Sequence, residues 1–128
     1  MRVLIVEPQQ DFGRLMSDSL AWENAVCDHA INVQEAIHLA DQNLPDVVIL
    51  ELNLAGHNGL EFLYELRSHT DWKDVPVVIY SHVSPQEAGL DKATKKRLGI
   101  TDYLYKPLTS FKKLNQVARG AVFESAGR

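Results

Sequence analysis

Three short runs of apolar residues constrain this 128-residue chain more than any other feature of its sequence. The runs are Val3–Val6, Val47–Leu50 and Val77–Tyr80, and none of them alternates with polar residues. Continuous runs of this length, rich in β-branched residues and leucine, are typical of strands buried on both faces of a parallel sheet. The sequence therefore predicts a parallel sheet with both of its faces covered.

Segments with helical spacing separate and follow these runs. In such segments apolar residues recur three, four and seven or eight positions apart, as on one face of an amphipathic helix. Asn32 is a candidate N-cap of the second helix and Gly99 a C-terminal stop of the fourth. Thr109 or Ser110 is a candidate cap of the last. Five helices are expected, over 12–20, 33–40, 60–68, within 85–98, and over 114–122.

Two weaker strand patterns, at 25–29 and 103–105, complete a regular alternation of strands and helices. Alternation with short connections predicts an α/β fold, in which right-handed crossovers place helices on both faces of a parallel sheet. The length suits a single domain, expected over residues 1–124, with a frayed tail over 125–128. Ligands of such folds bind at the carboxyl ends of the strands.

The composition argues against several classes of protein. A single cysteine, Cys27, cannot form an internal disulfide, so a secreted disulfide scaffold is excluded and a reducing cytoplasm is expected. No apolar run approaches the roughly 20 residues of a membrane span. The net charge of −4 gives no reason to expect nucleic acid as a direct partner. Neither a membrane nor nucleic acid is therefore expected to bind this chain.

Polar side chains follow four of the expected strands at the point where each strand ends. They are Glu7, Glu51, Ser81 and Lys106. Because the carboxyl ends of parallel strands meet at one edge of a sheet, two carboxylates, a hydroxyl and an ammonium are expected to converge there. Polar residues end the strands of any parallel sheet, but that explains only one or two of the four.

Four segments in order, VLIVE, PDVVILELNLAGHNGLEFLYELR, PVVIYS and GITDYLYKPL, resemble the receiver domain (CheY-like) of two-component response regulators. The resemblance covers essentially the whole chain. It implies a flavodoxin-like, doubly wound (βα)5 three-layer sandwich whose five-stranded parallel sheet has the order 2-1-3-4-5. It also implies a site in which an aspartate after the third strand accepts a phosphoryl group from a histidine kinase.

The resemblance assigns a role to each residue of that site. Glu51 stands at the phospho-acceptor position, and Glu7 belongs to the acidic pocket that holds Mg²⁺. Ser81 and Tyr103 match the switch positions and Lys106 the pocket lysine. The metal ligands would be Glu7, Glu51 and the carbonyl of Asn53.

The chain departs from the family pattern at two of these positions. The acceptor is Glu51 rather than aspartate, and the second acidic residue is replaced by Pro8, which has no ligand atom. The extra methylene of a glutamate carries its carboxylate about 1.5 Å farther, toward Ser81 and Lys106, where in-line attack on a phosphoryl group is disfavoured. Two departures favour a natural variant over one engineered phosphomimetic change. Mg²⁺ is expected to bind weakly if at all, and no cofactor is required.

These departures predict an atypical, or pseudo-, receiver. The expected function is that of a stand-alone signalling domain of the phosphorelay type, not an enzyme, which acts by protein–protein contact without phosphorylation. Two alternatives stay open. One is a working phospho-acceptor, and the other is a structural or dimerisation module with an inactive pocket.

The expected partner is another signalling protein, a histidine kinase or a downstream effector. A basic run, usually no more than a solvated helix face, is a candidate partner face because receivers commonly meet partners with this surface. It comprises Lys92, Lys95, Lys96 and Arg97. A homodimer through the fourth helix, the fifth strand and the fifth helix is also possible by resemblance. His82 is either a gate to the pocket or a solvent-facing loop residue. The resemblance further implies a cis peptide bond between Lys106 and Pro107.

Overall fold

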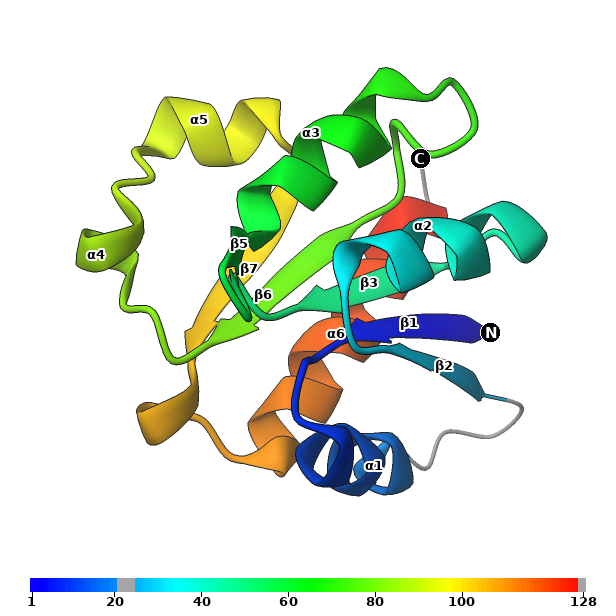
Figure 1. Ribbon diagram of the computed structural model, residues 1–128, viewed down its shortest axis with the longest axis horizontal. Helices are drawn as coiled ribbons and strands as arrows, with labels where there is room; N and C mark the ends of the chain where they lie inside the picture. Colours follow the sequence, from blue (N-terminus) through cyan, green and yellow to red (C-terminus); the bar gives the residue numbers. More distant parts are fainter. Residues whose placement is uncertain (21–24, 127–128) are drawn as a thin grey trace.

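The computed structural model describes residues 1–20 and 25–126, and it consists of a central parallel sheet between two layers of helices (Figure 1). The strand order is β2-β1-β3-β6-β7, which is the order 2-1-3-4-5 when only these five strands are numbered. All four neighbouring pairs are parallel. The strands are β1 (Arg2–Val6), β2 (Val26–Ala30), β3 (Val47–Leu50), β6 (Val77–Ser81) and β7 (Ile100–Tyr105).

Helices cover both faces of this sheet. On one face lie α1 (Gln10–Ser19) and α6 (Phe111–Ala126), and on the other lie α2 (Val33–Gln42) and α3 (Gly59–Ser68) (Figure 1). Two short helices, α4 (Pro85–Ala88) and α5 (Lys92–Arg97), lie on the α3 side, and a 3₁₀ turn, η1 (Lys106–Leu108), follows β7. The predicted three-layer α/β sandwich is confirmed. Within the described ranges, no helix combines the length and the apolar character needed to cross a bilayer.

The buried strands explain why their sequence is continuously apolar. In β1, Leu4 and Val6 pack against the α2–α3 layer, whereas Val3 and Ile5 pack against α1 and α6. The same alternation holds in β3, whose four residues are all buried. Every side chain of these strands therefore enters one of two cores, which leaves no position for a polar residue until the strand ends.

The range 85–98 holds two helices where one was expected, although the second, α5, ends just before Gly99, the predicted stop. Ser84 forms a capping box with Glu87 at the start of α4, and Gly89, at φ +64°, ends that helix after one turn. Asp91 then caps a new helix by accepting from the Thr94 N–H. Neither α4 nor α5 contains a buried residue, so no packed apolar face holds the two helices in one line.

A short hairpin after β3 was not predicted. It pairs β4 (Asn53–Leu54) with β5 (His57–Asn58) through a turn in which Ala55 and Gly56 have positive φ. Two-residue strands carry no alternation that sequence analysis can detect. The edge strands also differ from prediction: β2 lies one residue later than expected, and β7 begins three residues earlier.

The C-terminal end of the sheet corrects one further expectation. No cis peptide bond occurs in the described residues, so the Lys106–Pro107 bond is trans. Pro107 lies in the first turn of η1, where its fixed φ fits a helical turn. Residues 125 and 126 of the expected tail belong to α6, and 127 and 128 lie outside the described residues.

Candidate functional site

Four polar side chains from four strand ends meet at the carboxyl edge of the sheet. Glu7 and Glu51 directly follow β1 and β3, Ser81 is the last residue of β6, and Lys106 directly follows β7. Their exposed fractions are 2%, 4%, 0% and 9%, respectively. We call these four residues the ion cluster. Burial of charged groups costs several kcal/mol unless they are paired, so the contacts within the cluster decide its chemistry.

Each carboxylate oxygen of Glu51 accepts two hydrogen bonds. Oε2 accepts a hydrogen bond from the Ser81 hydroxyl and another from the Asn53 N–H, at 3.1 Å. Oε1 accepts from the Lys106 ammonium at 2.9 Å and from the His82 N–H at 3.1 Å. Burial alone raises the pKa of Glu51, but the hydrogen bonds from Ser81, Lys106 and Asn53 outweigh it and hold that pKa below its usual value. Glu51 is therefore a charged carboxylate with no free oxygen.

Lys106 lies between the two carboxylates of the ion cluster. Its ammonium donates to Oε1 of Glu7 and to Oε1 of Glu51. It also lies 4.7 Å from the ring centre of Phe12 and 5.7 Å from that of Tyr80, so aromatic faces cover it. Two carboxylates share this one ammonium, and the three groups together carry one net negative charge.

Tyr103 lies behind Ser81 and faces inward. Its hydroxyl donates to the Val83 carbonyl, and its half-buried ring packs against the core on the α2–α3 side of the sheet. Burial, with a smaller contribution from the charge of Glu51, raises the pKa of Tyr103 to about 12. The Ser81 oxygen accepts from the Val83 N–H at 3.0 Å, so Ser81 and Tyr103 both hold the backbone at Val83.

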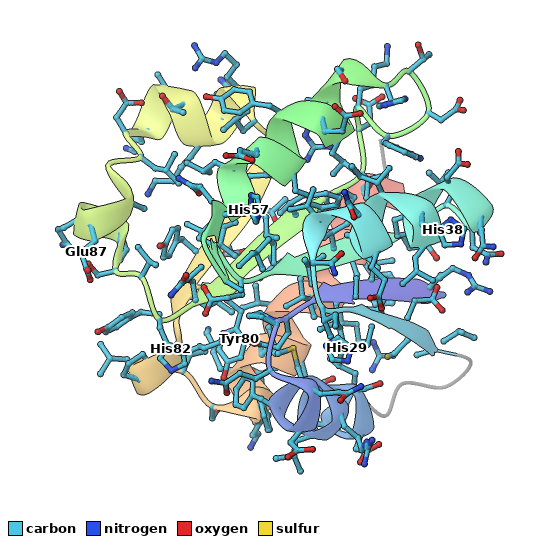
Figure 2. All side chains as sticks on the ribbon, viewed as in Figure 1. His29, His38, His57, Tyr80, His82 and Glu87 are labelled. Atoms are coloured by element: carbon cyan, nitrogen blue, oxygen red, sulfur yellow. The ribbon has the colours of Figure 1, made fainter. Side chains whose placement is uncertain are left out.

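His82 joins the site from the solvent side (Figure 2). Its side chain is 62% exposed, and its Nδ1 lies 3.5 Å from Oε1 of Glu51. It does not seal the pocket, because it also lines an open groove of about 290 Å³ with Phe12, Pro107 and Phe111. Of the two interpretations of His82, the structure favours the solvent-facing one, with Glu51 as its neighbour.

Several contacts of the site were missed by sequence analysis. The ring of Phe12 was expected only in the core of the first helix, and the Gln9 N–H, which donates to Oε2 of Glu7 at 2.9 Å, was not considered. Both residues lie on the loop and first turn after β1, and only the path of that loop brings them to the cluster. The sequence offered one signal for these contacts: Glu7 follows a strand and a helix begins soon after it, so the residues between them lie near the Glu7 carboxylate.

The ion cluster does not fit a divalent cation as it stands. Both carboxylates that a metal would need, Glu7 and Glu51, already bind the Lys106 ammonium. Pro8 supplies no ligand, and among the described residues no group of three His, Cys, Asp or Glu side chains is placed to hold a metal ion. Asn53, whose carbonyl was the third expected ligand, contacts the cluster through its backbone N–H, which donates to Oε2 of Glu51.

The basic run lies apart from the ion cluster, on α5. Lys92, Lys96 and Arg97 are exposed and Lys95 is half-buried. The helix packs on β7 and so belongs to the edge of the sheet that also carries Tyr103. This places a cationic helix surface beside β7, the strand that leads into the site.

Comparison with known proteins agrees with this architecture. The model of the response regulator receiver domain family matches residues 3–119. The chain belongs to that family. This receiver domain is similar to Protein PilH of Pseudomonas aeruginosa, with 34% identity over 71% of this chain and 75% of PilH. It is also 34% identical to the KDP operon transcriptional regulatory protein KdpE of Escherichia coli, over 82% of this chain, but it spans only 44% of KdpE.

Two solved structures share the fold of this receiver domain. The chemotaxis protein CheY4 of Vibrio cholerae superposes with a TM-score of 0.79 at 24% identity, covering 94% of this chain and 97% of CheY4. The Mn(2+)-bound form of response regulator Rcp1 superposes with a TM-score of 0.71 at 23% identity, covering 92% and 89%. The chain is thus a receiver domain of the two-component type, with the CheY-like fold.

Proposed function

We propose that this receiver domain signals by protein–protein contact without being phosphorylated, and that Glu51 takes the place of a phosphorylated aspartate. The observation that carries the proposal is the contact of one buried carboxylate with both Ser81 and Lys106. In the family that the chain resembles, these are the hydroxyl and the ammonium that would bind the phosphoryl oxygens. A carboxylate placed between them supplies acceptor oxygens without a kinase.

Three features support independence from phosphorylation. Both oxygens of Glu51 are engaged by donors, so neither is free to attack a phosphoryl donor in line. Lys106 is paired with both carboxylates that would otherwise hold the metal. Pro8 removes the remaining acidic ligand of the family pattern. The magnesium-dependent step of phosphoryl transfer therefore lacks both its nucleophile and its metal site.

The inward position of Tyr103 supports a bias toward one conformation. A carboxylate carries one charge and two oxygens, whereas an aspartyl phosphate carries nearly two charges and three acceptor oxygens. The Ser81–Glu51 contact is worth about 1 kcal/mol in such a setting, which changes the population of two states several-fold. Glu51 is thus a partial mimic that holds Ser81 and Tyr103 inward.

The partner would be another signalling protein of the cytoplasm, a histidine kinase or an effector. Receiver domains interact with both classes. The surface of α5 and β7 is the proposed contact face because its four basic side chains border the strand of Tyr103. The same surface would form a homodimer if a second copy were the partner.

The experiment has a chemical arm and a conformational arm. The protein is incubated with acetyl phosphate or beryllofluoride and Mg²⁺, and its intact mass and Tyr103 ring resonances are recorded. We expect no phosphoryl adduct and no change of the Tyr103 signals. Glu51→Gln and Glu51→Asp are then expected to move those signals and to weaken capture of the partner several-fold, because each variant loses the charge or the reach that holds Ser81.

Glu61→Gln is the matched control, since Glu61 has a 68% exposed side chain whose ion pair is with His57, outside the ion cluster. A stable phosphoryl adduct on the wild-type chain would establish a working phospho-acceptor instead. If partner capture and the Tyr103 signals were the same in wild type, Glu51→Gln and Glu51→Asp, the domain would be a structural module with an inactive pocket.

A further inference from the structure

Glu7 is fixed by its backbone as well as by its carboxylate. Its N–H donates to the Ala30 carbonyl at 2.9 Å, and its own carbonyl lies 2.8 Å from Nε2 of His29. A carbonyl can only accept, so Nε2 of His29 must carry the hydrogen. Two adjacent residues of β2 therefore hold the residue that follows β1.

The His29 ring occupies space that a side chain of α1 would otherwise fill. It lies against α1 at Gly13 (Figure 2), where an added Cβ would be 2.1 Å from Cε1 and 2.3 Å from Nε2 of the ring. Real Cβ contacts at such distances do not occur, so no residue larger than glycine coexists with this ring position.

Backbone conformation does not explain Gly13. The described glycines with positive φ are Gly56, Gly89 and Gly99, and Gly13 lies within a regular helix. Glycine inside a helix is disfavoured relative to alanine by about 1 kcal/mol. The chain therefore carries a helix-destabilising residue at a position of α1 where the His29 ring fills the space of a side chain.

We propose that His29 and Gly13 are a matched pair that positions Glu7 in the ion cluster. The His29 N–H holds the Glu7 carbonyl, Gly13 admits the ring, and the Gln9 N–H holds Oε2, so that Oε1 faces Lys106. Lys106 in turn holds Glu51. His29 is a positioning residue: it touches no carboxylate of the cluster and acts through the backbone of Glu7. The inference rests on the proposed function, because it concerns the same ion cluster.

The test measures the cluster itself and needs no partner, so it can fail or succeed independently of the signalling proposal. The readout is hydrogen exchange of the Lys106 ammonium, followed by ¹⁵N NMR. His29→Leu removes the donor at similar volume and is expected to speed this exchange about tenfold or more. His29→Gln keeps an N–H donor at a similar reach and is expected to restore most of the protection.

A second arm tests the pairing through thermal unfolding. Gly13→Ala is expected to lower Tm in the wild-type background, because the new Cβ displaces the ring. In the His29→Ala background the same change is expected to raise Tm by a few degrees, as glycine-to-alanine changes in helices do. This reversal of sign does not depend on how well either single variant folds.

Unchanged ammonium exchange in His29→Leu, or equal exchange in His29→Leu and His29→Gln, would overturn the positioning role and leave the ring as packing alone. A Gly13→Ala effect of the same sign in both backgrounds would overturn the pairing. If the exchange results hold while Glu51→Gln leaves partner capture unchanged, the positioning role stands and the signalling proposal fails.

Discussion

Lys106 is held between two carboxylates and two aromatic rings, and it is the only ammonium within the ion cluster. Its removal would leave Glu7 and Glu51 buried against one another without a counter-charge. Removal of one partner from a buried ion pair costs far more than the pair itself contributes, since an uncompensated charge remains in a poorly solvated site.

We therefore predict that Lys106→Met lowers the free energy of unfolding by about 3–5 kcal/mol, measured by urea denaturation at neutral pH. Lys112→Met, at an exposed position of α6, is the control and should change it by less than about 0.5 kcal/mol. A cost below about 1 kcal/mol for Lys106→Met would mean that water reaches the cluster and screens it.

The lowered pKa of Glu51 predicts a specific loss of stability in acid. A carboxyl group whose folded pKa lies below its unfolded value stabilises the fold at higher pH, and that stability is lost as the pH falls through the folded pKa. For Glu51 the loss begins near its ordinary value of 4.5 and continues below it. Thermal unfolding of wild type and Glu51→Gln between pH 7 and pH 3 measures it. The wild-type advantage should shrink below about pH 4.5, and a constant difference across this range would contradict the assignment.

At the scale of elements, Arg67 joins the loop that follows α3 to the end of α5, which is distant in sequence. From the last turn of α3 its guanidinium donates to the Leu98 carbonyl at 2.7 Å, the Trp72 carbonyl at 2.9 Å and the Val75 carbonyl at 2.7 Å. It thereby ties the loop before β6 to the end of α5, which has no buried residue of its own. Arg67 thus adds a side-chain anchor from α3 to the packing of α5 on β7.

We predict that Arg67→Met lowers the free energy of unfolding by about 3 kcal/mol, since several carbonyls lose a charged donor at once. The amides of α5 should then exchange with solvent faster than those of α3. Arg14→Met, at an exposed position of α1, is the control for loss of an arginine. Unchanged exchange in α5 would show that β7 alone holds this helix.

Two glycines near α5 allow the effect of a left-handed backbone to be compared with the effect of a crowded side-chain position. Gly89 and Gly99 have φ of +64° and +66°, but only Gly99 has a neighbour, with Nη2 of Arg67 2.7 Å from an added Cβ. Gly89→Ala should lower the free energy of unfolding by about 1–2 kcal/mol, because alanine is strained in the left-handed conformation. Gly99→Ala should lower the free energy of unfolding further, because Arg67 must move as well. Equal losses for the two variants in urea denaturation would show that the Arg67 guanidinium moves aside without losing stabilising hydrogen bonds.

For the whole molecule, the charge state of the ion cluster predicts weak metal binding. A divalent cation must displace Lys106 from both Glu7 and Glu51 before it binds. We predict that Mg²⁺ binds with a Kd above about 1 mM, measured by isothermal titration, and that Lys106→Met binds it more tightly. Saturation of the wild-type chain well below that concentration would contradict this reading of the cluster.

The sequence predicted the central strands and the residues that follow them, because a strand buried on both faces must be apolar until it ends. It located the edge strands less well, since β2 and β7 are half-exposed and carry mixed residues. The break at Gly89 was missed because Gly99 was taken as the stop of a single helix, although Ser84, Gly89 and Asp91 supply local caps. The trans bond before Pro107 was missed because the cis bond was expected from the family resemblance alone. The contacts of His29 and Phe12 with the site depend on how α1 packs on the sheet, and the spacing of residues in the sequence does not predict that packing.

The contact between Ser81 and Glu51 has a consequence for timing. An acyl phosphate hydrolyses, so a signal that depends on one decays by itself and must be renewed. Under the proposed function, a contact between two side chains of one chain does not decay in this way. The duration of the signal is then the lifetime of the polypeptide, and its strength follows the rates of synthesis and degradation. The cell would adjust such a receiver by the number of copies it keeps.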